Sequence, residues 1–240
     1  MIVSDRHRYV FIELPRTGSS AISRELRQSY DGRPFLRKHS TYREFLAAAR
    51  PEQRGYFAFS CIRNPLDDAV SRYFKYRTDH RAHFSQKGHP GRRGLVGLRD
   101  RLIWRWMQRR EMDFPAFFRS VYVVPYDNWA SESHGSLDLV IRFEHLEADF
   151  AAALARLGIE PIRPLPVRNV TGGRRRDFAA YYTPETIGRA KWVFGPFMRR
   201  WGYGFPSEWG EARLSRWAEA QFRVLGVLRA FYWRHLRFRI

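Results

Sequence analysis

Cysteine is almost absent from the 240-residue sequence, where the single Cys61 lies in the apolar run 56–62. One cysteine excludes an internal disulfide framework and supplies too few ligands for a zinc site. We therefore expect a buried core thiol in a cytoplasmic protein. The charged segment 1–8 leads directly into a predicted strand, so no signal region is expected there. Apolar runs long enough to cross a bilayer are also lacking.

Acidic residues are scarce as well. Lys and Arg number 43 against 24 Asp and Glu, which gives a formal net charge of +19, and the lysines are only Lys38, Lys75, Lys87 and Lys191. Such a charge favours an acidic partner: a nucleic acid, an anionic lipid or a polyanionic substrate. The arginines are spread along the whole chain, however, and an arginine bias can also follow from genomic base composition. No recognisable nucleic-acid-binding module is present, so no nucleic-acid partner is predicted.

Apolar runs and helix signals alternate along the chain. Buried strands are predicted at 9–14, 56–62 and 137–143. Helices are predicted to open at 18–20 and to cover 42–49, 65–77, 98–107, 113–120, 144–157 and 183–194. This order predicts an α/β fold, a three-layer sandwich with a mainly parallel sheet. We expect this domain to cover 1–206, with a variable acceptor-side insertion at 78–112.

The C-terminal part, 207–240, is predicted to form a separate tail. Apolar residues recur there at helical spacing and arginines occupy much of the rest, which is typical of a basic amphipathic helix. Three roles are open for 208–240: packing on the domain, peripheral contact with a membrane, or dimerisation. Membrane contact would place the protein at the inner face of the membrane.

The first candidate site follows the first predicted strand, where the sequence reads Leu14-Pro-Arg-Thr-Gly-Ser-Ser20. A helix that begins after a tight loop presents unpaired N–H groups and the positive end of its dipole to an anion. Gly18 allows close backbone approach, and Arg16 places a charge where a leaving oxygen would become negative. The Gly-Lys-Ser/Thr of a Walker A loop is absent. Hydroxyl donors come from Thr17, Ser19 and Ser20.

The second candidate segment is Cys61-Ile-Arg-Asn-Pro-Leu-Asp-Asp-Ala-Val-Ser-Arg-Tyr73. Arg63 stands at the end of a strand, where ligands of open α/β sheets collect. Ser71 follows about two turns into the next helix. An arginine and a hydroxyl could therefore converge on one phosphate.

Together the two segments resemble those of the PAPS-dependent sulfotransferases, particularly the carbohydrate branch that includes the uronyl 2-O-sulfotransferases and their bacterial relatives. That family pairs a Pro-Lys/Arg-Thr-Gly loop for the 5′-phosphosulfate with an Arg-Asn/Asp-Pro segment for the 3′-phosphate. Stretches 141–150 and 181–205 also look family-like, so the resemblance covers about 9–206. It implies a P-loop-like strand–loop–helix and PAPS as the sulfate donor.

The resemblance also implies roles for single residues. Arg16 matches the basic residue of the loop, usually lysine, and would bind the donor and assist catalysis. Asp68 departs from the family, which often has arginine there, and this puts the 3′-phosphate grip in doubt. In the basic loop 168–176, Arg174 or Arg175 would contact a phosphate. The remaining matches are Thr17, Gly18, Ser19 and Ser20 for the phosphosulfate, and Arg63 with Ser71 for the 3′-phosphate.

His39 is the candidate general base, because sulfuryl transfer to an alcohol needs a group that accepts the hydroxyl proton near neutral pH. In the relatives a histidine in the corresponding place often has this role. Glu13, at the end of the first predicted strand, is the alternative base. No metal is required for such a transfer, and the histidines show no metal-ligand spacing.

The sequence therefore predicts in-line transfer of a sulfuryl group from PAPS to a hydroxyl of a glycan or glycoconjugate. The insertion 78–112, with its arginines beside Trp104 and Trp106, suits a glycan through charge and stacking. Two alternatives stay open. One is a P-loop-type nucleotide kinase, and the other is a non-catalytic, membrane-associated sulfotransferase-like protein.

Overall fold

The computed structural model describes residues 1–86, 94–128, 133–166, 177–211 and 215–232. The chain packs as two compact units. The sheet unit comprises Met1–Asn64 and Asn128–Val170, and the helical unit comprises Pro65–Asp127 and Thr171–Ile240. The predicted division into a domain at 1–206 and a tail at 207–240 stays a prediction.

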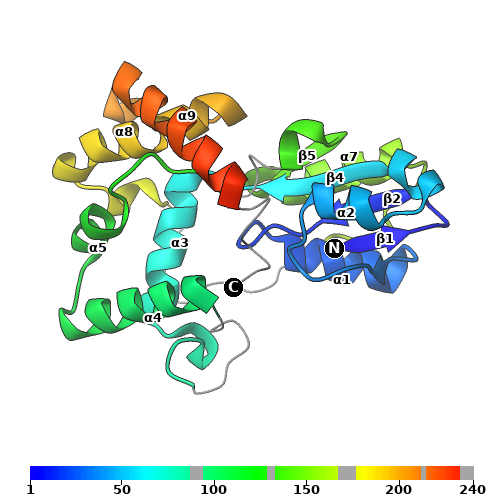
Figure 1. Cartoon of the computed structure of the whole chain (residues 1–240), viewed down its shortest axis with the longest axis horizontal. Helices are drawn as coiled ribbons and strands as arrows, with labels where there is room; N and C mark the ends of the chain where they lie inside the picture. The colour runs from blue at the N-terminus through cyan, green and yellow to red at the C-terminus, as the bar shows by residue number, and fades with distance from the viewer. Residues whose placement is uncertain (87–93, 129–132, 167–176, 212–214, 233–240) are drawn as a thin grey trace. The chain divides into compact units, whose positions relative to one another are not determined.

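The sheet unit contains a five-stranded sheet with the order β3-β1-β2-β4-β5 (Figure 1). β2 pairs in parallel with β4, and β4 with β5. β1 runs antiparallel to β2 and to β3. The α/β class is confirmed, and the sheet is mixed, with β2, β4 and β5 as its parallel part. The strands are β1 (Ile2–Ser4), β2 (Tyr9–Ile12), β3 (Arg33–Pro34), β4 (Phe57–Ile62) and β5 (Leu139–Arg142).

Helices pack on the sheet because its strands are apolar on both faces. Tyr9 and Phe11 of β2 pack with α1 (Ser19–Ser29) and α7 (Leu146–Arg156) in one buried cluster. Val10 and Ile12, which point the other way, pack with residues of α2 (Tyr42–Ala48) in a second cluster. Thr41 caps α2 through a capping box with Glu44. The described part of this unit also contains the 3₁₀ turns η1 (Pro51–Gly55), η4 (His134–Ser136) and η5 (Phe143–His145).

The helical unit is held together by aromatic side chains. Tyr73 contacts Phe114 and Phe117 edge-on or tilted, and Phe118 packs against Phe194. Its helices are α3 (Pro65–Arg77), α4 (Gly94–Arg109), α5 (Phe114–Val121), α8 (Pro184–Trp201) and α9 (Arg216–Phe231). Its 3₁₀ turns are η2 (His80–Ala82), η6 (Ala179–Tyr181) and η7 (Ser207–Trp209).

Two helices differ most from the sequence-based expectation. α8 continues beyond Phe194 to Trp201 although Pro196 lies inside it. The buried side chains of Phe197 and Met198 explain the extension, because their burial offsets the backbone hydrogen bond that proline cannot donate. α9 begins at Arg216 rather than at 208, since Ser215 supplies the N-cap by accepting from the Ala218 amide.

Cys61 is fully buried in β4, as predicted. Burial raises the pKa of its thiol, which makes a reactive thiolate unavailable near neutral pH. Across the described parts of the chain, no helix combines the length and apolar character required to cross a membrane.

Candidate functional site

The loop between β2 and α1, residues 15–20 and hereafter the 15–20 loop, is closed by its own hydroxyl groups. Thr17 Oγ1 donates to the carbonyl oxygen of Leu14 at 2.9 Å, and Ser19 Oγ donates to the same oxygen at 2.6 Å. Both side chains are buried. Because a hydroxyl has one proton to donate, these two groups brace the loop in this structure rather than offering a proton to a ligand.

Gly18 is a position of the loop where another residue would be poorly tolerated. Its φ of 76° lies in the left-handed region, and a Cβ atom there would stand 2.7 Å from Cδ2 of Leu146. The backbone of Arg16 is also in the left-handed region, with a φ of 64°. The tight backbone of the loop therefore depends on close packing against the start of α7.

α1 begins directly at this loop. Gly18 is its N-cap and supplies no side-chain hydrogen bond, so the first N–H groups of the helix lack a side-chain cap. Ser20, half-buried in the first turn, accepts a hydrogen bond from Lys38 Nζ at 3.3 Å. The helix dipole and a lysine ammonium thus place positive charge at the same end of α1.

Arg63 follows β4 and reaches the 15–20 loop. Its Nη1 donates to the carbonyl oxygen of Arg16 at 3.0 Å, and its guanidinium lies over the Phe143 ring at 4.1 Å from the centroid. The side chain is buried. The two sequence segments that carried the family resemblance therefore meet in the sheet unit, through a guanidinium that is fixed on both sides.

Ser71 lies in the second turn of α3, in the helical unit, and is buried. Its pairing with Arg63 on a phosphate stays a prediction. Asp68, on the same helix, is buried and accepts a hydrogen bond from the Tyr126 hydroxyl at 3.2 Å. The residue that departs from the family pattern thus takes part in the packing of the helical unit.

His39 is attached to the end of the central strand. Its Nδ1 lies 2.9 Å from the carbonyl oxygen of Glu13. A carbonyl oxygen only accepts, so Nδ1 carries the proton and the neutral ring has its lone pair on Nε2. Burial lowers the pKa of His39, which keeps the ring neutral at neutral pH. This is the protonation state that a general base requires.

Glu13, the alternative base, is engaged by cations. Its Oε2 accepts from the amino group of Met1 at 2.7 Å, and its Oε1 lies 4.0 Å from Lys38 Nζ. The carboxylate is almost fully buried. These contacts make Glu13 an anchor: its backbone holds His39, and its side chain holds Lys38 close to Ser20.

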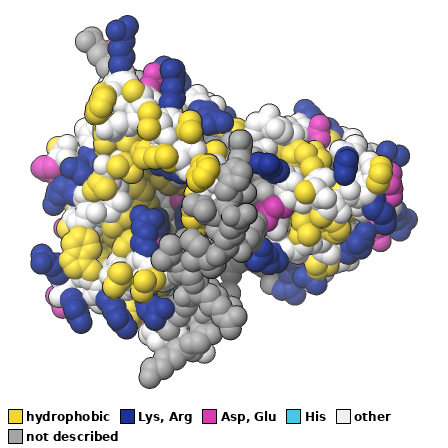
Figure 2. Space-filling view, viewed as in Figure 1, with side chains coloured by type: hydrophobic (Ala, Val, Ile, Leu, Met, Phe, Trp, Pro, Cys, Tyr) yellow, Lys and Arg dark blue, Asp and Glu magenta, His cyan; other side chains and the backbone are white. Residues whose placement is uncertain are grey.

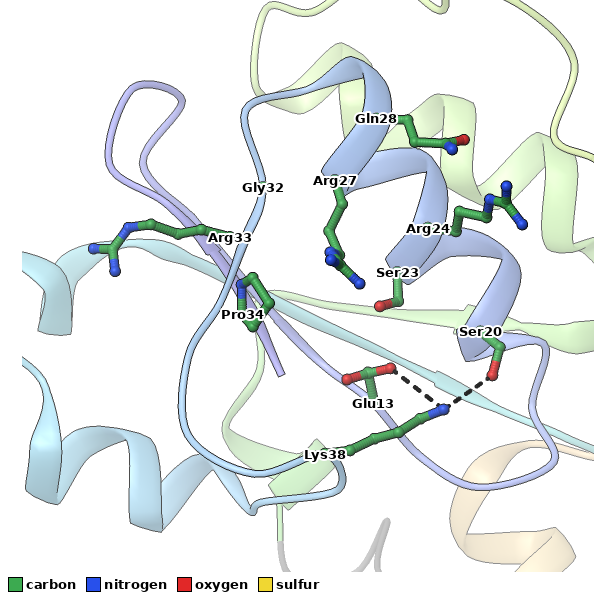
Figure 3. Close-up of a pocket in the computed structure, with 10 residues that line it drawn as sticks. All are labelled: Glu13, Ser20, Ser23, Arg24, Arg27, Gln28, Gly32, Arg33, Pro34 and Lys38. Carbon is green, nitrogen blue, oxygen red and sulfur yellow. Dashed lines mark hydrogen bonds and ion pairs between the residues drawn. The ribbon is translucent and has the colours of Figure 1, made fainter.

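An open cavity of about 570 Å³ lies beside Ser20, between α1 and the segment that carries Gly32, Pro34 and Lys38 (Figure 3). Arg24 and Arg27 project from α1, one and two turns beyond Ser20. Arg33 points away and pairs with Asp5 at 2.6 Å. The cavity is therefore cationic, since its one carboxylate is the engaged Glu13. Its lining residues are Glu13, Ser20, Ser23, Arg24, Arg27, Gln28, Gly32, Arg33, Pro34 and Lys38.

Lys38, Arg24 and Arg27 were missed by the sequence-based prediction. A rare lysine directly before the candidate base was a usable signal for Lys38. The two arginines carried no such signal, because exposed arginines occur along the whole chain. Only the cavity that they line sets them apart.

Other predicted site residues lie elsewhere. Arg174 and Arg175 fall outside the described residues. Trp104 of the predicted insertion packs against the core of the helical unit and stacks on Phe84, so core packing accounts for it rather than a glycan. Trp106 is exposed. Within the described ranges, no group of three or more His, Cys, Asp or Glu side chains could hold a metal ion.

Comparison of the chain with protein-family models, with curated proteins and with solved structures finds no match.

Proposed function

We propose that this chain is a PAPS-dependent sulfotransferase, and that the 15–20 loop binds the 5′-phosphosulfate. The observation that carries the proposal is the attachment of His39 to Glu13, two residues before that loop. His39 and Glu13 are 26 positions apart in the sequence, and their contact joins the candidate base to the strand end that leads into the 15–20 loop. We also propose that the fold is a three-layer sandwich with a P-loop-like motif, and that the protein is cytoplasmic.

PAPS, when bound, supplies the sulfuryl group, and adenosine 3′,5′-bisphosphate is its leaving group. Nε2 of His39 accepts the proton of the acceptor hydroxyl as the acceptor oxygen forms its bond to sulfur. The Arg16 side chain and the first N–H groups of α1 stabilise the negative charge that the bridging oxygen gains as the sulfur–oxygen bond breaks. Lys38, held beside Ser20, adds a further positive charge at that end of the helix. Ser20 contributes its hydroxyl, and Thr17, Gly18 and Ser19 keep the loop in shape.

Arg63 is proposed to bind the 3′-phosphate. Its contacts with the Arg16 carbonyl and the Phe143 ring hold the guanidinium in one position, which lowers the entropic cost of gripping a phosphate. The parts that Ser71, Arg174 and Arg175 take in this grip rest on the sequence alone.

The cavity beside Ser20 is proposed to receive the acceptor, a hydroxyl-bearing glycan or glycoconjugate. It is lined by Lys38, the neighbour of His39 in the chain, and by Glu13, whose carbonyl oxygen contacts His39. Arg24 and Arg27 can pair with acidic groups of such an acceptor.

Two assays test the proposal. Adenosine 3′,5′-bisphosphate should raise the melting temperature of the protein, whereas ATP with Mg²⁺ and a DNA oligonucleotide should leave it unchanged. With ³⁵S-labelled PAPS, the protein should transfer label to a member of a glycan panel. Selective stabilisation by ATP would favour a kinase. Stabilisation by the bisphosphate without transfer to any acceptor would favour a non-catalytic relative.

A further inference from the structure

α9 is attached to the helical unit by one of its faces. Ala218 and Phe222 are buried, and α9 packs against α8. Glu219 forms an ion pair with Arg199 of α8. Arg229 donates to the carbonyl oxygen of Pro125 at 2.8 Å. These contacts fix which side of α9 faces away from its unit.

The outward side of α9 is apolar. Trp217, Val224, Val227, Leu228 and Phe231 are between 56% and 71% exposed. Their spacing of three, four and seven residues places most of them along one stripe of the helix. Single exposed apolar residues are ordinary, but a helix packed on a domain should be polar on its outer side. A contiguous apolar stripe of this kind marks an interaction surface.

The charged residues beside the stripe indicate which kind of partner it binds. Arg216 and Arg223 are exposed on α9 beside the stripe. Its one acidic residue, Glu219, is engaged by Arg199. Figure 2 shows hydrophobic and Lys or Arg side chains intermixed over the region that α9 occupies in Figure 1. An anionic surface would complement these arginines, whereas a second copy of a chain with charge +19 would bring like charges together.

We propose that the outward face of α9 binds peripherally to an anionic membrane surface. The apolar stripe enters the boundary between headgroups and acyl chains, and the arginines contact lipid phosphates. With 16 residues α9 is too short to cross the bilayer, so it lies in the plane of the interface. This inference does not depend on the proposed transfer reaction.

Vesicle sedimentation with the full chain tests it. We expect binding to vesicles rich in phosphatidylglycerol that is at least about tenfold tighter than binding to phosphatidylcholine vesicles, and weaker at high salt. Val227→Gln/Phe231→Gln should reduce binding about tenfold or more, because the apolar contact is lost. Arg216→Gln/Arg223→Gln should reduce binding to anionic vesicles and flatten its salt dependence. Glutamine suits an exposed helix position, so both variants should keep the wild-type melting temperature.

Ile162→Gln is the matched control, because Ile162 is an equally exposed apolar residue of the sheet unit. It should bind vesicles like the wild type. The proposal is overturned if the wild type does not bind anionic vesicles, or if the α9 variants bind them as well as the control does. Sedimentation velocity tests the competing explanation, that a second copy of the chain packs on the stripe. In that case the wild type would be a dimer that does not bind vesicles, and Val227→Gln/Phe231→Gln would be a monomer.

Discussion

The Nδ1 atom of His39 lies 2.9 Å from the carbonyl oxygen of Glu13, at the end of the sheet's central strand. This contact determines which ring nitrogen carries the proton and joins the candidate base to the strand that leads into the 15–20 loop. Glu13 also holds Lys38 through its carboxylate. One residue thus positions two neighbouring side chains of the proposed site.

His39→Ala should lower turnover by roughly a hundredfold or more, because the proton acceptor is removed. Binding of adenosine 3′,5′-bisphosphate should be retained, since no hydroxyl is deprotonated in that complex. Steady-state kinetics and calorimetry measure the two quantities. His7→Ala, in the turn between β1 and β2, is the matched control and should behave as the wild type. Near-normal turnover of His39→Ala would remove the base assignment.

The pH profile of turnover should reflect the buried state of His39. A base works only when neutral, so activity falls as the pH drops through its pKa. Burial lowers the pKa of His39, and the acidic limb should therefore lie below the ordinary histidine value of about 6.5. A limb above that value would mean that another group acts as the base.

Lys38→Met should lower turnover about tenfold or more, because it removes a cation held 3.3 Å from Ser20 Oγ. Lys38→Arg should restore part of the activity. Arg43→Met removes an exposed charge from α2 and serves as the control. If Lys38→Met and Arg43→Met have equal, small effects, Lys38 has no part in the chemistry.

Gly18→Ala should destabilise the protein by roughly 1–3 kcal/mol, because alanine is strained at positive φ and its Cβ would collide with Leu146. Gly55→Ala is the control, since a Cβ at Gly55 meets nothing within 4 Å. Urea unfolding measures both free energies. A stable Gly18→Ala variant would show that the loop does not need its left-handed glycine.

The free energy of unfolding should decrease at acidic pH, because His134 is buried in its neutral form. Its Nε2 lies 3.0 Å from the Cys61 carbonyl oxygen, and burial lowers the pKa of His134 to about 4. The unfolded chain takes up this proton near pH 6.5 and the folded chain only near its lowered pKa. Stability is therefore complete above about pH 6.5 and is lost as the pH falls toward 4, by roughly 3 kcal/mol in total.

Urea unfolding at about pH 7 and about pH 5 measures this loss, and His134→Gln should show a shallower dependence. Equal pH dependence in the variant and the wild type would assign the acid sensitivity to other groups.

The sequence predicted the parts of the fold that depend on local pattern. The apolar runs identified β2, β4 and β5, and Pro65 marked the start of α3. β1 and β3 escaped prediction because three and two residues are too short for an alternating pattern, and their pairing is tertiary.

For the site, the sequence pointed to the 15–20 loop and His39, and the structure places Nδ1 of His39 against the carbonyl oxygen of Glu13, two residues before that loop. It could not show that the hydroxyls of Thr17 and Ser19 turn inward, because hydroxyl direction depends on rotamers and on the nearby Leu14 carbonyl. Nor could it separate Arg24 and Arg27 from other exposed arginines, since the cavity that they line forms only in the folded chain.

The proposed function requires that this chain recognises the nucleotide of PAPS. Calorimetric titration with adenosine 3′,5′-bisphosphate and with adenosine 5′-monophosphate measures this recognition, because the two ligands differ only in the 3′-phosphate. We expect the bisphosphate to bind at least about tenfold tighter than the monophosphate, through the charge-assisted contacts of the 3′-phosphate. Equal affinity for the two nucleotides, or no binding of either, would contradict it.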